Sequence, residues 1–261
     1  MGKTYCANGT VVQVKPSGEK NFMVVAITKE TGLLNATLYG GPKSRLKSLV
    51  SPWNSGIFYL TEGQNGQFPK LNDFDVKKYH ESFRSDLFKM WAASLAAEIA
   101  IKTKCADNNE ECLKIFQGFI DGLELCKTKE KGQAGLIRFL WRYLQILGMQ
   151  PDVSLCSQCQ ASFLGRNLSL DNVKYIPGGA NYIPQENSFV CTDCSKAKTS
   201  LYLGIDAIQY LAAVSALKPS ESRTFPLSQE GAGQLKELVF YLSQNACGSS
   251  LKSLESGIGI L

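Results

Sequence analysis

The chain has 261 residues, enough for one large core or for two to three smaller ones. Hydrophobic residues make up 44% of it and charged residues 20%, which excludes an intrinsically disordered chain. The net charge of +5 lies in the first third, because residues 1–80 hold 10 Lys/Arg against 5 Asp/Glu and residues 81–261 hold 18 of each. A basic module beside a neutral one favours a polyanionic partner, although charge alone is equally compatible with an ordinary solvated surface.

Membrane insertion and export are not expected from this sequence. No apolar run reaches the ~18 residues of a membrane span, and the first residues lack the apolar core of a signal peptide. Nine cysteines, an odd and unevenly spaced set, favour reduced thiols over a disulfide framework. We therefore expect a cytoplasmic protein without membrane association.

The first 80 residues alternate short apolar, β-branched runs with Gly- and Pro-containing turns. Strands are expected at residues 10–14, 22–28, 33–39, 57–61 and 68–76. Five strands at such short spacing predict a small β-sandwich or β-barrel.

Residues 81–150 change to helical periodicity. A stripe of apolar residues four apart runs through Phe83, Leu87, Trp91, Leu95 and Ile99. Further helices are expected at residues 110–125 and 134–147, and two more within residues 201–246, the first of them including Leu203. We interpret their apolar stripes as core. The Gly/Ser-rich residues 251–261 predict a loosely packed tail.

Residues 151–199 are irregular and hold two Cys-x-x-Cys pairs, Cys156/Cys159 and Cys191/Cys194. This spacing lets both sulfurs of a pair reach one ion at about 2.3 Å, and two pairs complete a tetrahedral Zn²⁺ shell with no open position for catalysis. The gap between the pairs exceeds the ~15–20 residues of a compact zinc ribbon, so we expect a loop with structure of its own. A redox Cys-x-x-Cys is the less favoured alternative, because both pairs lie in loop-like sequence.

The other cysteines and the lone histidine suggest no chemistry. Buried, small apolar side chains are expected for Cys6, Cys105, Cys112, Cys126 and Cys247. His80 is the single histidine and is expected at the surface, and neither Gly-x-Ser-x-Gly nor a P-loop motif occurs. We expect no catalytic turnover.

A basic segment with nearby aromatic residues lies in the predicted strand region. Cations along a small barrel, with aromatic faces for base stacking, are typical of oligonucleotide-binding (OB) barrels. A core position is favoured for Phe22, whereas core and surface remain equally open for Tyr39 and Trp53. The candidate DNA-binding residues are Lys15, Lys20, Tyr39, Lys43, Arg45 and Lys47.

The order of these parts resembles the RecO family of bacterial recombination mediators. Stretches similar to that family are Lys29–Leu33, Pro42–Leu46, Arg138–Gly148 leading to Pro151 and Cys156-x-x-Cys159, and Leu251–Ser253. The junction between the helix and the first Cys-x-x-Cys pair is the most specific of them.

The resemblance implies a multidomain α+β fold. Residues 1–80 would form a five-stranded OB-fold barrel, residues 81–150 and 200–261 a mostly helical domain, and residues 151–199 a zinc-binding insertion. It also implies a DNA repair and homologous recombination mediator of the RecF pathway. Such a protein binds single- and double-stranded DNA, anneals complementary strands and, with RecR, loads RecA onto DNA coated by single-stranded-DNA-binding protein at the nucleoid.

The resemblance further implies a site for the acidic C-terminal tail of single-stranded-DNA-binding protein. Arg138 and Arg142 are four residues apart, hence on one helix face, and could meet its carboxylates. The same spacing is about equally compatible with two ordinary surface arginines, or arginines paired within the helix, that bind no partner.

Three other functions stay open at this stage. A zinc-stabilised RNA-binding or translation-associated module would use the same barrel and thiols. A protein-interaction scaffold would need neither the cations nor a nucleic acid. A thiol redox enzyme is the least favoured.

Overall fold

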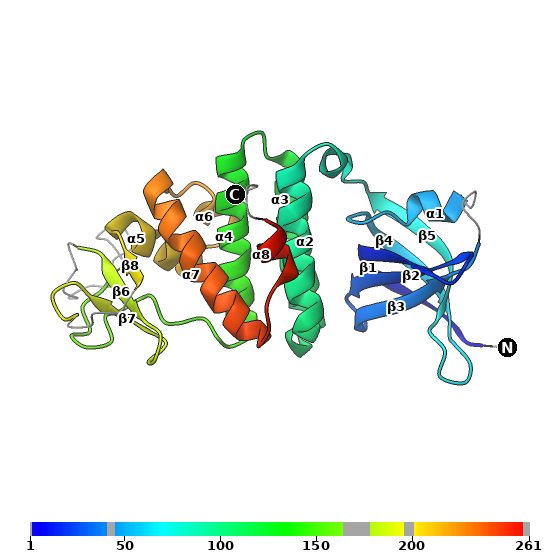
Figure 1. Cartoon of the computed structure of the whole chain (residues 1–261), viewed down its shortest axis with the longest axis horizontal. Coiled ribbons are helices and arrows are strands. Elements are labelled where there is room, and N and C mark those ends of the chain that lie inside the picture. Colours follow the sequence, from blue (N-terminus) through cyan, green and yellow to red (C-terminus); the bar gives the residue numbers. More distant parts are fainter. Residues whose placement is uncertain (1, 41–44, 164–177, 196–200, 258–261) are drawn as a thin grey trace. The chain divides into compact units, whose positions relative to one another are not determined.

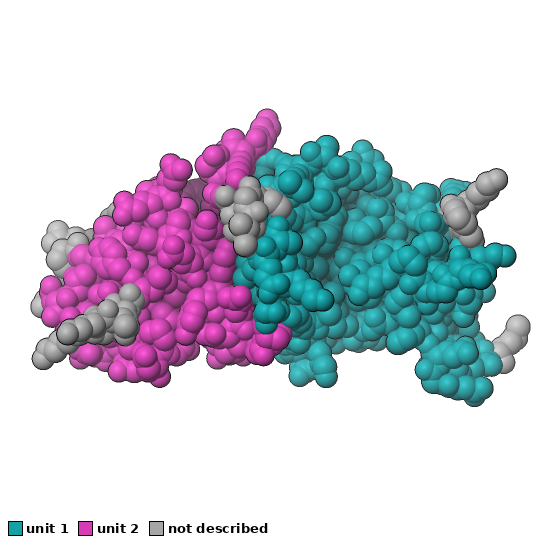
Figure 2. Space-filling model, in the orientation of Figure 1, with its two compact units in different colours: residues 1–126, 250–261 teal, residues 127–249 magenta. Residues whose placement is uncertain are grey.

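The computed structural model describes residues 2–40, 45–163, 178–195 and 201–257. Strands dominate its N-terminal part and helices follow (Figure 1), so the predicted α+β class is confirmed. Packing divides the chain into two compact units, residues 1–126 with 250–261 and residues 127–249 (Figure 2). The predicted domain boundaries after residues 80, 150 and 199 stay a prediction.

No helix in the described ranges combines the length and the apolar character that crossing a membrane requires.

Five strands form the N-terminal sheet, as the sequence predicts. Their pairings follow the closed order β1-β2-β3-β5-β4, with β4 returning to β1. Neighbours are antiparallel except β3 and β5, which meet in parallel at the single pair Thr37 and Lys70. The short helix α1 (Arg45–Leu49) precedes β4. The strands are β1 (Thr4–Ser17), β2 (Asn21–Thr28), β3 (Gly32–Leu38), β4 (Ser55–Thr61) and β5 (Lys70–Lys78).

The interior of this sheet follows the alternation of its strands. On β4, Phe58 and Leu60 are buried while Tyr59 between them is exposed. Phe58 stacks on Phe74 of β5 with 4.3 Å between ring centroids. Phe22 packs against the same core, as expected. Trp53 is also buried, which settles the question that the sequence left open for it.

Two long helices follow the sheet in the first unit. They are α2 (Leu87–Lys102) and α3 (Asn109–Leu125), and each begins at an Asp or Asn side chain that accepts a hydrogen bond from the first turn. The predicted apolar stripe is buried except at Leu87, which is exposed.

The turn between α2 and α3 is left-handed. Residues 104–107 all have φ between 49° and 57°, a conformation that costs an L-residue about 1–2 kcal/mol. Buried Cys105 lies in this turn and Cys112 in α3, so the prediction of buried thiols is confirmed for these two. It is wrong for Cys6, which is exposed on β1; Cys126 and Cys247 are half-buried.

The chain returns to this unit at its end, where α8 (Lys252–Ser256) packs on α2. Leu251 is fully buried, and Trp91 Nε1 donates to the Ser253 carbonyl at 2.6 Å. The Glu98 carboxylate accepts the backbone N–H groups of Lys252 and Ser253 at 3.0 and 2.8 Å. The prediction of a loose tail is therefore wrong for residues 251–257, while residues 258–261 lie outside the described part.

Replacing Glu98 by Gln should destabilise the fold at neutral pH. Burial raises the pKa of Glu98, but hydrogen bonds from Ser253 and Lys252 and the charge of Lys102 outweigh it and leave the pKa below its usual value. Its stabilising effect should therefore be complete at neutral pH and be lost as the pH falls below about 4. Thermal unfolding should show a Glu98→Gln deficit of about 1–2 kcal/mol at pH 7 that closes in acid. A deficit that is independent of pH would contradict this explanation.

The second unit combines helices with a small sheet. The helices predicted at residues 134–147 and within 201–246 are confirmed, but Leu203 lies in a strand and not in a helix. Two strands also lie in the segment expected to be irregular. The elements are α4 (Lys129–Ile146), β6 (Ala180–Ile183), β7 (Ser188–Cys191), β8 (Leu201–Leu203), α5 (Ile205–Ala216), α6 (Pro219–Ser222) and α7 (Gln229–Cys247). The sheet order is β7-β6-β8.

Candidate nucleic-acid interface and metal centre

The four cysteines of the two Cys-x-x-Cys pairs meet in the second unit. All four Sγ atoms of Cys156, Cys159, Cys191 and Cys194 lie within 4.8 Å of one another, and those of Cys159 and Cys191 are 3.9 Å apart. Bonds of 2.3 Å at tetrahedral angles would place sulfurs about 3.8 Å apart. The predicted cluster therefore has the donors and the spacing to hold one metal ion.

Backbone groups favour the thiolate at one of the four cysteines. The N–H of Cys191 donates to Cys156 Sγ at 3.3 Å. Burial raises the pKa of Cys156, but N–H groups of Cys159, Cys191 and Gln158 outweigh it and lower the pKa to about 7. The thiolate is the form that binds metals, so these hydrogen bonds favour the binding state at Cys156. At Cys194, by contrast, side-chain hydrogen bonds with Cys191 and Cys159 raise the pKa to about 12.

The cluster is tied to the helices of its unit by aromatic packing. The Ser157 N–H donates to the carbonyl of Phe189 on β7 at 2.9 Å. The Phe189 ring contacts Trp141 of α4 and Tyr182 of β6. Strands β6 and β7 lie between the two cysteine pairs, as expected for a loop with structure of its own. An ion in the cluster would thus hold the small sheet against α4.

Cations gather at one end of the barrel. Lys15 lies near the end of β1, Lys20 in the following turn, and Arg45 and Lys47 on α1. Strand register brings together the ends of β1 and β3, because Phe22 of β2 lies opposite both Pro16 and Leu38. Lys47 of α1 lies over the Phe22 ring. Tyr39 follows β3 directly and is 49% exposed. We call this set, with Lys70, the cationic end; the predicted Lys43 lies outside the described residues.

Lys70 is a member of the cationic end that sequence reasoning missed. It starts β5, pairs with Thr37 of β3, and places its Nζ 5.9 Å from the centre of the Tyr39 ring. Lys47 Nζ lies 4.1 Å above the Phe22 ring. The sequence shows only that Lys70 is basic. Its position beside Tyr39 results from the pairing of β3 with β5.

The charges of the cationic end have no ion-pair partner in the part of the chain that the structure describes. Among the described residues, none of its Lys or Arg side chains forms an ion pair, whereas Lys29, Lys77 and Lys78 each do. Glu19, in the β1–β2 turn, is an acidic residue directly before Lys20 in the sequence. Such an uncompensated basic surface attracts a polyanion.

The two arginines predicted to bind a partner lie on α4, next to α5. Arg138 donates to the Tyr210 hydroxyl at 2.6 Å. Arg142 donates to the carbonyls of Val214 and Leu217 and to Ser222 Oγ, at 3.3, 3.3 and 3.0 Å, and so satisfies the end of α5. Burial and the charges of Arg138 and Arg223 lower the pKa of Arg142. This environment holds several guanidinium groups close together.

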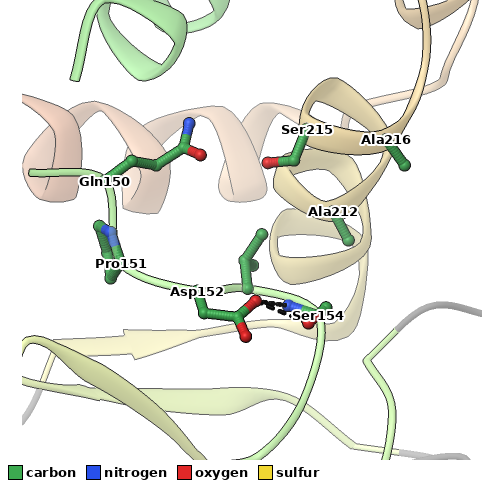
Figure 3. A pocket seen from close by; sticks show the side chains of 8 residues that line it. Gln150, Pro151, Asp152, Ser154, Ala212, Ser215 and Ala216 are labelled. Atoms are coloured by element: carbon green, nitrogen blue, oxygen red, sulfur yellow. Dashed lines mark hydrogen bonds between the residues drawn. The ribbon is translucent and has the colours of Figure 1, made fainter. Parts of the chain in front are cut away.

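A pocket of about 420 Å³ lies between residues 150–154 and α5 (Figure 3). Its polar groups are engaged within the protein. Asp152 Oδ1 accepts from the Ser154 N–H and hydroxyl at 2.8 and 2.6 Å, and Ser215 Oγ accepts from Trp141 Nε1 at 2.9 Å. None of the predicted site residues lines it, and no sequence motif indicated it.

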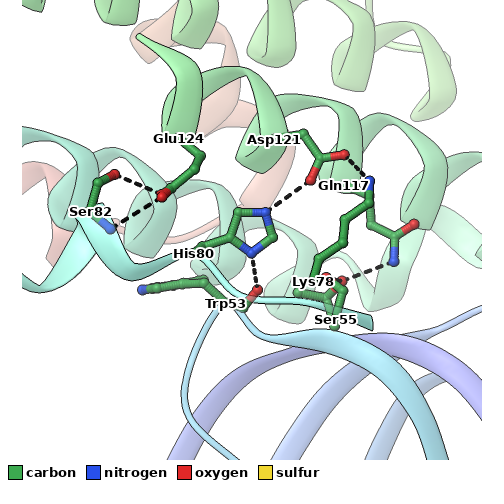
Figure 4. Close-up of polar contacts among 9 residues, drawn as sticks. Trp53, Ser55, Lys78, His80, Ser82, Gln117, Asp121 and Glu124 are labelled. Atoms are coloured by element: carbon green, nitrogen blue, oxygen red, sulfur yellow. Dashed lines mark hydrogen bonds and ion pairs between the residues drawn. The ribbon is translucent and has the colours of Figure 1, made fainter. Parts of the chain in front are cut away.

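His80 is buried where the barrel meets α3, so its predicted surface position is wrong. Its Nδ1 lies 2.8 Å from the Trp53 carbonyl and its Nε2 2.9 Å from Asp121 Oδ1 (Figure 4). Lys78 forms an ion pair with the same carboxylate. These contacts join β5 to α3, and His80 therefore has a structural role.

A second polar group continues this junction in Figure 4. Ser82 donates to Glu124 Oε2 at 2.7 Å. Buried Lys89 donates to Ser82 Oγ at 3.0 Å and to the Glu124 carbonyl at 3.1 Å. These contacts hold the start of the 3₁₀ turn at residues 81–84 against the end of α3.

Comparison with known proteins identifies the family. Residues 84–255 match the family described as Recombination protein O C terminal. Three similar relatives are each named DNA repair protein RecO. That of Synechococcus sp. is 22% identical over 88% of this chain and 78% of its own, and that of Bacillus pumilus 23% over 95% and 91%. That of Nostoc sp. is 25% identical over 62% of this chain and 56% of its own.

The family match covers more than half of the chain and includes α2 to α7 and the four-cysteine cluster. The relatives extend the similarity over most of the length, including the basic N-terminal sheet. The chain therefore belongs to the RecO family of DNA repair and recombination proteins.

Proposed function

We propose that this chain is a recombination mediator that binds single- and double-stranded DNA and anneals complementary strands without a bond-making step of its own. The cationic end is the observation that carries the proposal, because its Lys and Arg side chains form no ion pair in the described part of the chain. Lysine and arginine bind phosphates whatever the base sequence.

The barrel supports this function as an OB-type module. Its strands follow the order β1-β2-β3-β5-β4, and α1 lies between β3 and β4 along the chain. Proteins of this type bind oligonucleotides over strands 2 and 3 and the loops beside them. Phe22, Tyr39 and Lys20 belong to that region here.

Annealing requires that two polyanions approach each other while their bases stay free to pair. Phosphate contacts of Lys15, Lys20, Arg45 and Lys47 would reduce the repulsion without reading base edges. The exposed Tyr39 ring can stack on an unpaired base.

The partners follow from the same role. We propose that the protein acts with RecR at the cytoplasmic nucleoid to load RecA onto DNA coated by single-stranded-DNA-binding protein. Arg138 and Arg142, close to Arg223, would hold the acidic tail of that coating protein. Arg142 already donates to two carbonyl groups at the end of α5. It would therefore both fix this helix end in place and supply positive charge to the bound tail.

We propose Zn²⁺ as the ion of the four-cysteine cluster. Four thiolates at this spacing form a closed shell for zinc, which leaves no coordination position for a substrate. The ion would supply structure to the β6–β7 region and no step of a reaction.

Annealing of complementary, dye-labelled oligonucleotides tests the proposal. The intact protein should accelerate annealing at low salt, and the effect should fade as salt competes for the phosphates. No acceleration at low salt would contradict it. A competition between single-stranded DNA and structured RNA separates the alternative, because a strong RNA preference would favour an RNA-binding module.

A further inference from the structure

A second face of the barrel presents two carboxylates. Strand register places side chains of β1, β4 and β5 in two neighbouring rows. The residues between the rows, Ala7, Phe58 and Phe74, are buried, so the rows point outward. The rows are Cys6, Tyr59 and Asp73, then Asn8, Ile57 and Asp75.

Both charged residues in these rows are carboxylates. Asp75 forms an ion pair with Lys77, a cation that also lies near Tyr59. Asp73 is therefore the carboxylate of these rows whose charge is not offset by an ion pair among the described residues. Asp73 follows Lys70 of the cationic end by three residues on β5, which is about 10 Å along a strand. The acidic rows and the cationic end therefore adjoin on one barrel.

Each of these two surfaces presents an exposed tyrosine. Tyr39 is 49% exposed and lies beside Lys70, while Tyr59 is 39% exposed and lies opposite Asp73. Stacking alone cannot distinguish them, because every base offers a π face to any exposed ring. The charge beside each ring can distinguish them, since a base brings its phosphates with it.

We propose that Asp73 and Asp75 exclude nucleic acid from the β1-β4-β5 face and confine a bound single strand to the cationic end. Tyr39, and not Tyr59, is then the tyrosine that stacks on a base. A phosphate beside Tyr59 would lie within the Debye length of about 8 Å of a carboxylate, where repulsion is only partly screened at physiological salt. This inference rests on the proposed DNA binding and adds the path of the strand.

Photo-cross-linking at the two tyrosines tests this path directly. Full-length protein would carry p-benzoylphenylalanine in place of either Tyr39 or Tyr59 and would be irradiated with a labelled oligothymidylate at saturating concentration. Saturation removes differences in affinity between the two variants, so the yields report the path of the strand. We expect the cross-link yield at position 39 to exceed that at position 59 about tenfold, because the strand stacks on the ring at position 39. Equal yields at the two positions would overturn the inference.

Neutralising the acids provides the complementary measurement. Asp73→Asn with Asp75→Asn should raise the affinity for the oligothymidylate about two- to fivefold at low salt, and it should make position 59 cross-link. The matched control, Glu237→Gln with Glu255→Gln, removes two exposed carboxylates from α7 and α8 and should change neither quantity.

The results separate this inference from the function on which it rests. If the parent protein binds DNA but the neutralised variant gains neither affinity nor cross-linking at position 59, the acids do not set the path and the inference is overturned. If neither position cross-links and the protein binds no DNA, the proposed function itself falls, together with the inference. Unchanged melting temperatures would verify that the variants remain folded.

Discussion

Removal of the proposed metal ion, by a chelator or by Cys191→Ser, should unfold the β6–β7 region while the barrel stays intact. Structural zinc contributes on the order of 10 kcal/mol to the folding of small metal sites. The small sheet has little backbone pairing of its own to replace that contribution, because β6, β7 and β8 are only three or four residues long. Cys191 both ends β7 and belongs to the cluster, so its substitution affects the strand directly.

Hydrogen–deuterium exchange would measure this effect segment by segment. Protection should fall by at least about a hundredfold at residues 180–183 and 188–191, which corresponds to a loss of about 3 kcal/mol or more. Protection at β1–β5 should not change. Cys247→Ser is the matched control, because Cys247 lies in the same unit but outside the cluster. Equal protection of β6 and β7 with and without metal would contradict a structural role of the ion.

Removing three cations from the cationic end should reduce affinity for single-stranded DNA by about ten- to a hundredfold at low salt. The variant is Arg45→Ala, Lys47→Ala and Lys70→Ala. Each substitution that removes a cation from a phosphate should lower the slope of log affinity against log salt by about 0.7, hence by about 2 in total. The reason is that fewer counterions are released when fewer phosphates are neutralised.

The control for this triple variant removes the same charge elsewhere. Lys114→Ala, Lys127→Ala and Lys252→Ala change exposed lysines outside the barrel and should leave the salt slope unchanged. Filter binding or fluorescence anisotropy over a salt series measures both quantities. An equal reduction of affinity in the two triple variants would show that net charge, and not the cationic end, determines binding. A triple variant with full affinity and annealing activity would favour the protein-interaction scaffold.

Local patterns in the sequence were enough to predict most of the elements. The five N-terminal strands, the helices at α3, α4 and α7, and the four-cysteine cluster follow from periodicity and spacing within short segments. The two-residue spacing within each Cys-x-x-Cys pair is a local feature, so the sequence alone was enough to identify both pairs as candidate ligands. Short strands without a strong alternation, such as β8 at Leu201–Leu203, were not distinguishable from a helix start.

The positions of single polar residues were decided by contacts between distant segments. His80 is buried because Trp53 and Asp121, from two other elements, supply partners for both of its ring nitrogens. Leu251 is buried because Glu98 and Trp91 of α2 bind the segment that follows it. No local pattern contains this information.

The separation of charge on the barrel has the same origin. The sequence by itself determined that the first 80 residues are basic and form strands. Only the tertiary structure decided that Lys70 joins Tyr39 while Asp73, three residues later, joins Tyr59. The physical reason is that each strand pairs with two different neighbours and turns alternate side chains to opposite faces, so residues adjacent in sequence enter different surfaces.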